Sequence, residues 1–138
     1  MPTSHKNKTL ATLLAAVTGG IGLHRFYLFD KKDFWGWAHL ATAPLTSLLI
    51  AFRPEAPMLF TGAPFVVSVL AGFLEALVIG LTPDDKWDAR HNPASTHKSG
   101  SGWPLALVLV LTLGVGAVAL IATIARTFDL LFTGGAYG

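Results

Sequence analysis

Four apolar stretches alternate with short polar segments along the chain. They run from about Thr9 to Leu23, from Phe34 to Phe52, from about Met58 to Leu81 and from Trp103 to Ala125. A helix needs about 20 residues to cross a hydrocarbon core of roughly 30 Å. Because a bilayer offers no water to backbone groups, these stretches are expected to be helical throughout. The pattern predicts an all-α integral membrane bundle of about four transmembrane helices.

The first stretch is the shortest of the four. It can span a bilayer if the helix continues toward Phe29, or if Lys8 and Arg25 extend to the interface of a locally thinned bilayer. A cleaved signal peptide is the alternative, but no clear cleavage site follows the stretch. We therefore expect four parts, namely a two-helix core at 6–52, a third helix with an acidic-aromatic tail at 56–92, a polar linker at 93–102, and a fourth helix with a short tail at 103–138.

The composition supports a membrane location. Apolar residues make up 52% of the chain and charged residues 13%, which is roughly half the charged share of an ordinary soluble domain. The net charge of +2 is too small to indicate nucleic-acid binding, and the absence of cysteine excludes disulfides and thiolate chemistry. No enzyme motif, metal site or cofactor site is recognisable, so we expect no enzymatic activity.

The distribution of positive charge gives an expected orientation. Four spans would place both termini on one side, and the first and third connections on the other. Six of the ten Lys and Arg residues lie in those two connections, namely Arg25, Lys31, Lys32, Lys86, Arg90 and Lys98. Because cytoplasmic loops carry the excess of positive charge, this weak majority favours cytoplasmic connections and external termini.

Small residues recur every fourth position in the third stretch, at Ser68, Gly72, Ala76 and Gly80. Membrane helices approach each other closely at such residues. The stripe therefore predicts a helix-packing surface. Its partner is either a helix of the same chain or a second copy.

Ionisable residues in the apolar stretches form the candidate site. Glu75 lies inside the third stretch, His39 inside the second, and His24 and Arg25 end the first. In a four-helix chain these positions share one membrane face, so the four side chains can meet. A charge inside a membrane is costly unless it is paired, and we expect an Arg25–Glu75 ion pair with a histidine nearby. Structural stabilisation is the favoured interpretation, and a proton or ion pathway is the alternative.

The segment from Lys6 to Phe34 reads KNKTLATLLAAVTGGIGLHRFYLFDKKDF. It resembles the TM-two domain family of NINE-type small membrane proteins, whose core is two helices joined by a short loop. Eight matching residue types fall within ten positions, namely Gly19, Gly20, Gly22, His24, Arg25, Phe26, Tyr27 and Leu28. Residues 73–75 and 82–92 also look like the tail of bacterial members. The resemblance implies a bacterial cytoplasmic membrane protein, with no established activity to carry over.

Two features of this motif have consequences of their own. The three glycines allow close approach of a helix or a lipid headgroup, with His24 and Arg25 expected to contact headgroup phosphates and Phe26 and Tyr27 to anchor at the interface. Phe29 stands where the family usually has glycine. Since glycine permits a positive-φ turn, the turn must be of another type or be shifted to Asp30 and Lys31.

Together these observations favour a non-enzymatic multi-pass membrane protein with a structural or interaction role. Its expected partners are the lipid bilayer and either another membrane protein or a second copy of the chain. The alternative is a small ion or proton channel, or a transporter subunit, that uses Glu75 and the nearby histidines.

Overall fold

The computed structural model describes residues 4–137, so Gly138 at the end of the expected C-terminal tail lies outside it. All the regular structure within this range is helical. The α-helices are α1 (Lys8–Thr18), α2 (Leu23–Phe29), α3 (Phe34–Phe52), α4 (Met58–Thr61), α5 (Ala63–Leu81), α6 (Asp84–His91) and α7 (Trp103–Thr133), with 3-10 turns at Gly19–Ile21 and Asp30–Lys32.

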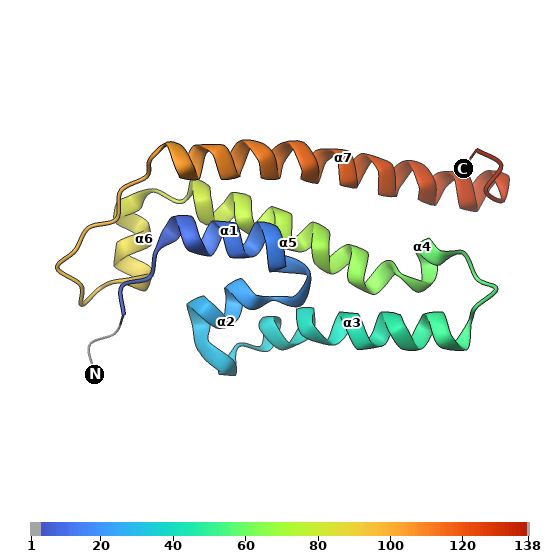
Figure 1. Cartoon of the computed structure of the whole chain (residues 1–138), viewed down its shortest axis with the longest axis horizontal. Coiled ribbons are helices and arrows are strands. Elements are labelled where there is room, and N and C mark those ends of the chain that lie inside the picture. Colours follow the sequence, from blue (N-terminus) through green and yellow to red (C-terminus); the bar gives the residue numbers. More distant parts are fainter. Residues whose placement is uncertain (1–3, 138) are drawn as a thin grey trace.

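The first two helices form a hairpin instead of one continuous helix. Gly22 has a left-handed backbone with φ of 74°, a conformation that glycine adopts without the penalty of a Cβ atom. The chain reverses there, and α2 runs back beside α1 (Figure 1). As a result the Tyr27 hydroxyl accepts a hydrogen bond of 2.9 Å from the amide of Asn7, which caps the start of α1.

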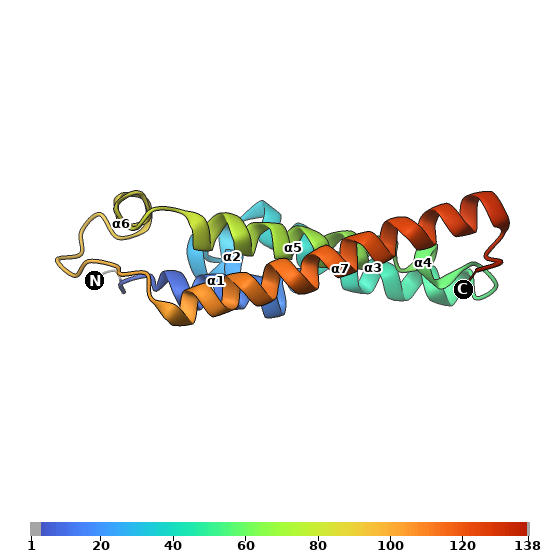
Figure 2. The same ribbon diagram turned by 90° about the horizontal axis from the view of Figure 1, so that it is seen from above.

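The remaining long helices, α3, α5 and α7, run along the length of the molecule (Figure 1). The N-terminal segment, α6 and the connection between α2 and α3 lie toward one end, which we call the N-terminal end. The C-terminus and the connection at 53–57 lie at the other end, and the view in Figure 2 agrees. The molecule therefore has its two termini at opposite ends.

This arrangement corrects the expected topology. The first helix was expected to run straight through to the opposite face, which would separate the N-terminus from the segment at 82–102. Instead, the backbone amide of Lys6 donates a 2.7 Å hydrogen bond to the side chain of Asn92, and the Lys8 ammonium donates to the carbonyl of Thr82 at 2.8 Å. The physical reason is the reversal at Gly22, which returns the chain to the end where it began.

The third stretch is also divided. The expected helix from Met58 to Leu81 ends at Thr61, and a new helix begins at Ala63, because Pro64 has no amide hydrogen to continue the first. The free amide of the following Phe65 donates instead to the hydroxyl of Thr46 in α3, at 3.2 Å.

The fourth helix is longer than expected and continues beyond Ala125 to Thr133. Arg126 and Asp129 do not end it, because they form an ion pair one turn apart on its surface. At 1.5 Å per residue its 31 residues extend for about 46 Å.

Helix α5 lies at the centre of the packing. The predicted stripe of Ser68, Gly72, Ala76 and Gly80 is buried along its whole length. A methyl group added to Gly72 would come within 2.6 Å of the Cα of Gly19, so the two backbones touch. The partner left open by the sequence is therefore α1 and its 3-10 turn in the same chain.

Within the described residues, α5 and α7 are the two helices long and apolar enough to cross a membrane. Lys8–Ile21 is apolar but shorter. The expectation of an all-helical protein is confirmed, while the expectation of four spanning helices is not.

Candidate functional site

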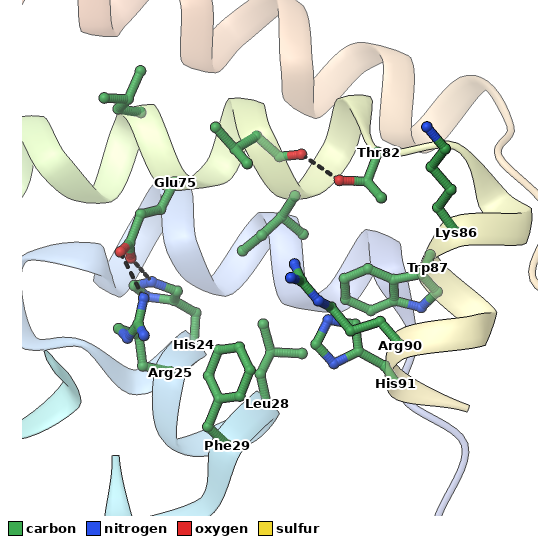
Figure 3. A pocket seen from close by; sticks show the side chains of 13 residues that line it. His24, Arg25, Leu28, Phe29, Glu75, Thr82, Lys86, Trp87, Arg90 and His91 are labelled. Atoms are coloured by element: carbon green, nitrogen blue, oxygen red, sulfur yellow. Dashed lines mark hydrogen bonds and ion pairs between the residues drawn. The ribbon is translucent and has the colours of Figure 1, made fainter. Parts of the chain in front are cut away.

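Glu75 forms the centre of a polar cluster that joins three helices. It projects from α5, beside the buried stripe, toward α2 and the start of α3. Figure 3 shows its carboxylate directed at His24 and Arg25 of α2. The structure therefore brings together all four of the ionisable residues that the sequence singled out.

The Glu75 carboxylate is engaged on both oxygens. One oxygen accepts a 2.8 Å hydrogen bond from Nη1 of Arg25. The other pairs with Nε2 of His24, and Nε2 of His39 lies 3.8 Å away from it. His24 is 1% exposed and Glu75 keeps 29% of its side-chain exposure. The carboxylate thus has a cationic partner and a ring N–H donor, the kind of partners that a charge inside a membrane would require.

The hydrogen-bond network assigns the tautomers of both histidines. The hydroxyl of Ser68 donates to the carbonyl of Gly20 at 2.7 Å, so it must accept from Nδ1 of His39 at 2.6 Å. His24 donates through Nε2 to Glu75, and its Nδ1 has no partner among the described residues. In a neutral His24 ring, Nδ1 carries only a lone pair, which leaves no unsatisfied N–H group.

Asp33 is a member of the cluster that sequence reasoning missed. Its carboxylate accepts from Nε of Arg25 at 2.7 Å and from the amide of Gly36 at 2.7 Å, so it both pairs with α2 and caps α3. The Arg25 hydrogen bond holds the pKa of Asp33 below its ordinary value, against the effect of burial. The available signal was its position directly before an apolar run, where Asp is a preferred cap.

The three glycines of the motif at Gly19, Gly20 and Gly22 make contacts within the chain. Gly19 contacts Gly72, Gly20 contacts Val69, and Gly22 lies against Gly36 and His39. The three glycines therefore accommodate other helices of this chain.

The expected contacts of His24 and Arg25 with headgroup phosphates are wrong, because Glu75 and Asp33 already bind these side chains. Phe26 and Tyr27 also make intramolecular contacts. The Phe26 ring fills the space next to Gly36, and the carbonyl of Tyr27 accepts from Lys6 at 2.7 Å.

The turn after α2 shows the consequence of Phe29. The positive φ has moved to Asp30, with φ of 62°, while Phe29 has φ of −119°. Of the two alternatives left open by the sequence, the structure shows the shift, at Asp30 and not at Lys31.

A second polar cluster holds the N-terminal segment against α6. Lys8 pairs with Asp84, and the indole of the buried Trp87 donates to the carbonyl of Lys6 at 3.0 Å. Asp88 accepts from the hydroxyl of Ser99 at 2.6 Å. Asp84 and Asp88 of α6 thus bind the N-terminal segment and the linker.

Two cavities adjoin the Glu75 cluster. A cavity of about 540 Å³ lies between α2, α5 and α6, and one of about 430 Å³ lies between α3 and α5. Arg25 and Glu75 line both of them. No group of three or more His, Cys, Asp or Glu side chains within residues 4–137 is arranged to hold a metal ion.

The segment that contributes the α2 and α3 residues of the cluster is similar to a known protein family. Residues 4–52 match the TM2 domain family model. The searches of curated proteins and of solved structures gave no match. The match confirms the resemblance of this segment to the TM-two family, and together with the two long apolar helices it suggests a membrane protein. Residues 4–52 of this chain are therefore similar to the TM2 domain family.

Proposed function

We propose that this chain is a non-enzymatic, multi-pass protein of the bacterial cytoplasmic membrane with a structural or protein-interaction role. In this proposal α3, α5 and α7 cross the bilayer, while the α1–α2 hairpin enters from the N-terminal end and returns to it. The N-terminus is cytoplasmic and the C-terminus external.

The distribution of basic residues supports this orientation. Eight of the ten Lys and Arg residues belong to the half of the molecule at the N-terminal end, namely Lys6, Lys8, Arg25, Lys31, Lys32, Lys86, Arg90 and Lys98. Arg53 and Arg126 belong to the other half. An eight-to-two ratio is a much stronger signal for the positive-inside rule than the six-to-four ratio of a four-span topology.

The single observation that carries the structural role is the pairing of Glu75 within the chain. Arg25 takes one carboxylate oxygen and His24 the other, and Arg25 is itself held by Asp33. A carboxylate on an ion pathway must bind and release the ions that pass it. The Glu75 contacts instead hold α2, α3 and α5 together. The cluster is therefore suited to fixing the helix arrangement.

A proton pathway is the second candidate, because the two cavities meet the cluster from different sides. The larger cavity extends toward α6, and the smaller one lies between α3 and α5 beside His39 and Thr42. A proton relayed between them would have to pass the Glu75 carboxylate.

Proton flux into proteoliposomes separates the two candidates. We expect the reconstituted wild-type chain to acidify the lumen no faster than protein-free vesicles under an imposed potential and pH gradient. The Glu75→Gln variant should behave identically. A wild-type flux above the vesicle background that Glu75→Gln abolishes would overturn the structural proposal in favour of the pathway.

A further inference from the structure

The larger cavity combines a basic rim with an apolar wall. It lies between α2, α5 and α6 (Figure 3). Helix α6 lies at the N-terminal end of the molecule (Figure 1). Helix α6 crosses this end at a steep angle to the long helices, as the views in Figures 1 and 2 agree. The cavity therefore lies where the apolar helix α5 gives way to polar chain, which is the level of the lipid headgroups if the long helices cross a bilayer.

The basic rim comes from α6. Lys86 and Arg90 are four residues apart, so they lie on one helical face, and both are exposed. Figure 3 shows Arg90 extending from α6 into the cavity, with Lys86 nearer its edge. No salt bridge within residues 4–137 involves either side chain. The rim thus offers two cations that have no carboxylate partner in the described chain.

The acids around the cavity are already engaged. Glu75 at its inner end is bound by Arg25 and His24. Asp84 and Asp88 bind Lys8 and Ser99 and do not line this cavity. Burial, followed by the charge of Arg90, holds the pKa of His91 below its ordinary value, as expected for a base in a positively charged environment.

The apolar wall opens toward the surroundings. Leu74 and Val78 of α5 are one turn apart and line the cavity with exposed fractions of 64% and 62%. Leu28 and Phe29 of α2 line it as well. A molecule that placed an anionic group between the two α6 cations could extend an alkyl chain along this side of α5.

We propose that the cavity binds an anionic phospholipid, with its phosphate between Arg90 and Lys86 and an acyl chain along Leu74 and Val78. Basic pockets between helices at the membrane surface are suited to anionic headgroups. An inorganic phosphate ion would satisfy the rim but leave the apolar wall uncovered, so the lipid is the favoured source of the phosphate. This inference rests on the proposed membrane location and is independent of the orientation.

Native mass spectrometry of the full chain, released from detergent or nanodiscs containing phosphatidylglycerol and phosphatidylcholine, tests the charged part of the site. We expect the wild type to retain one phosphatidylglycerol in preference to phosphatidylcholine. Since each basic residue near a membrane surface contributes about 1 kcal/mol, the Lys86→Gln/Arg90→Gln variant should bind phosphatidylglycerol about 30-fold more weakly.

The matched control is Lys31→Gln/Lys32→Gln, which removes two exposed cations from the same end but outside the cavity. It should retain the lipid as the wild type does.

Three results would contradict the proposal. If this control lost as much phosphatidylglycerol as the Lys86→Gln/Arg90→Gln variant, the lipid would be held by the general positive charge of this end and not by the cavity. If the wild type retained phosphatidylcholine as well as phosphatidylglycerol, the site would not select the headgroup. Displacement of the lipid by millimolar inorganic phosphate would identify free phosphate as the ligand.

The apolar part has its own test. Val78→Trp should fill the groove and reduce phosphatidylglycerol retention without changing the charge. Val118→Trp on α7, at a comparably exposed position away from the cavity, is the control. Retention unaffected by Val78→Trp would contradict the acyl-chain placement. Flotation of every variant with liposomes measures membrane insertion independently, so a failure of the membrane assignment is distinguishable from a failure of the lipid site.

Discussion

Gly22 decides where the chain reverses. Its φ of 74° is costly for any residue with a Cβ atom, and an added Cβ would lie 2.8 Å from the Cβ of His39 and 2.9 Å from the carbonyl oxygen of Gly36. Backbone strain and a close contact therefore act at the same position. The site cluster depends on this residue, because the reversal is what directs His24 and Arg25 toward Glu75.

Replacing Gly22 with alanine should destabilise the protein by about 2 kcal/mol or more, from the left-handed strain and the contact with α3 together. The free energy of unfolding in detergent, followed by circular dichroism, measures this change. Gly114→Ala is the control, since an added Cβ there meets nothing within 4 Å. It lies inside α7, so alanine should be neutral or stabilising by up to about 1 kcal/mol. Equal stability of the two variants would exclude a special role for Gly22.

At the scale of the elements, Arg25 connects α2 to two other helices. Its guanidinium pairs with Glu75 of α5 through Nη1 and with Asp33, the cap of α3, through Nε. An exchange of charges between Arg25 and Glu75 would restore only the first pair. The new glutamate at position 25 would face the carboxylate of Asp33, and like charges at this distance repel each other.

The Arg25→Glu/Glu75→Arg variant should therefore remain less stable than the wild type, by about 1 to 3 kcal/mol, between the cost of breaking an exposed pair and that of breaking a buried pair. Adding Asp33→Asn should recover part of the loss, because asparagine keeps the cap on α3 and removes the repulsion. Thermal unfolding of the wild type, the double variant and the triple variant gives the comparison. A double variant as stable as the wild type would show that Asp33 does not couple to Arg25.

The helices differ in how far the sequence determines them. Helix α3 has the predicted ends, because Asp33 caps its start and the polar segment from Arg53 follows its end. The hairpin was not predictable from local pattern, since closely spaced glycines permit both a continuous helix and a reversal. The choice depends on the contact of Gly22 with Gly36, which is a tertiary interaction.

The segment that forms α6 was expected as the acidic-aromatic tail of the third helix and not as a helix of its own. It is helical with Asp84 and Asp85 in its first turn and Arg90 and His91 in its last, which complements the helix dipole.

The members of the cluster could be predicted because burial of an ionisable residue requires a partner, and few partners were available. Arg25, His24, His39 and Glu75 were found in this way. Asp33 and the Lys8–Asp84 pair lie in polar segments. Their charges do not distinguish a solvated residue from a structural one, and only the position of Asp33 before an apolar run indicated a role as a helix cap.

The whole molecule is asymmetric along its length. Most of the charged residues lie at the N-terminal end. There, hydrogen bonds connect the N-terminal segment, α6 and the linker. The opposite end is mainly apolar, and the second half of α7 exposes large side chains such as Val118, Ile121 and Phe128. Such asymmetry is typical of a membrane protein whose polar face lies on one side of the bilayer.

The polar end should loosen in acid. Hydrogen bonds from Lys8 to Asp84 and from Asn92 to Asp88 lower the pKa of each carboxyl below the ordinary value of 3.8. Carboxyls with a lowered pKa stabilise the folded state fully above their ordinary value, and the contribution is lost as the pH falls below it. We expect the emission of Trp87, in a variant retaining only this tryptophan, to be constant at pH 5 and to shift to longer wavelength below about pH 4.

The Asp84→Asn/Asp88→Asn variant is the control for this titration. It should show the shifted emission already at pH 7 and little further change in acid. A transition of the parent protein centred above pH 5 would instead assign the loosening to a histidine.

The topology is tested most directly by labelling single cysteines, which the chain permits because it contains none of its own. Ser4→Cys, Ala94→Cys and Ala136→Cys each place one thiol at an exposed position. In intact cells, a membrane-impermeant maleimide should label only the cysteine at position 136, and permeabilisation should expose the other two. Labelling of both 4 and 136 in intact cells would restore the four-span topology and contradict the hairpin. Labelling of 4 and 94 but not 136 would contradict the orientation.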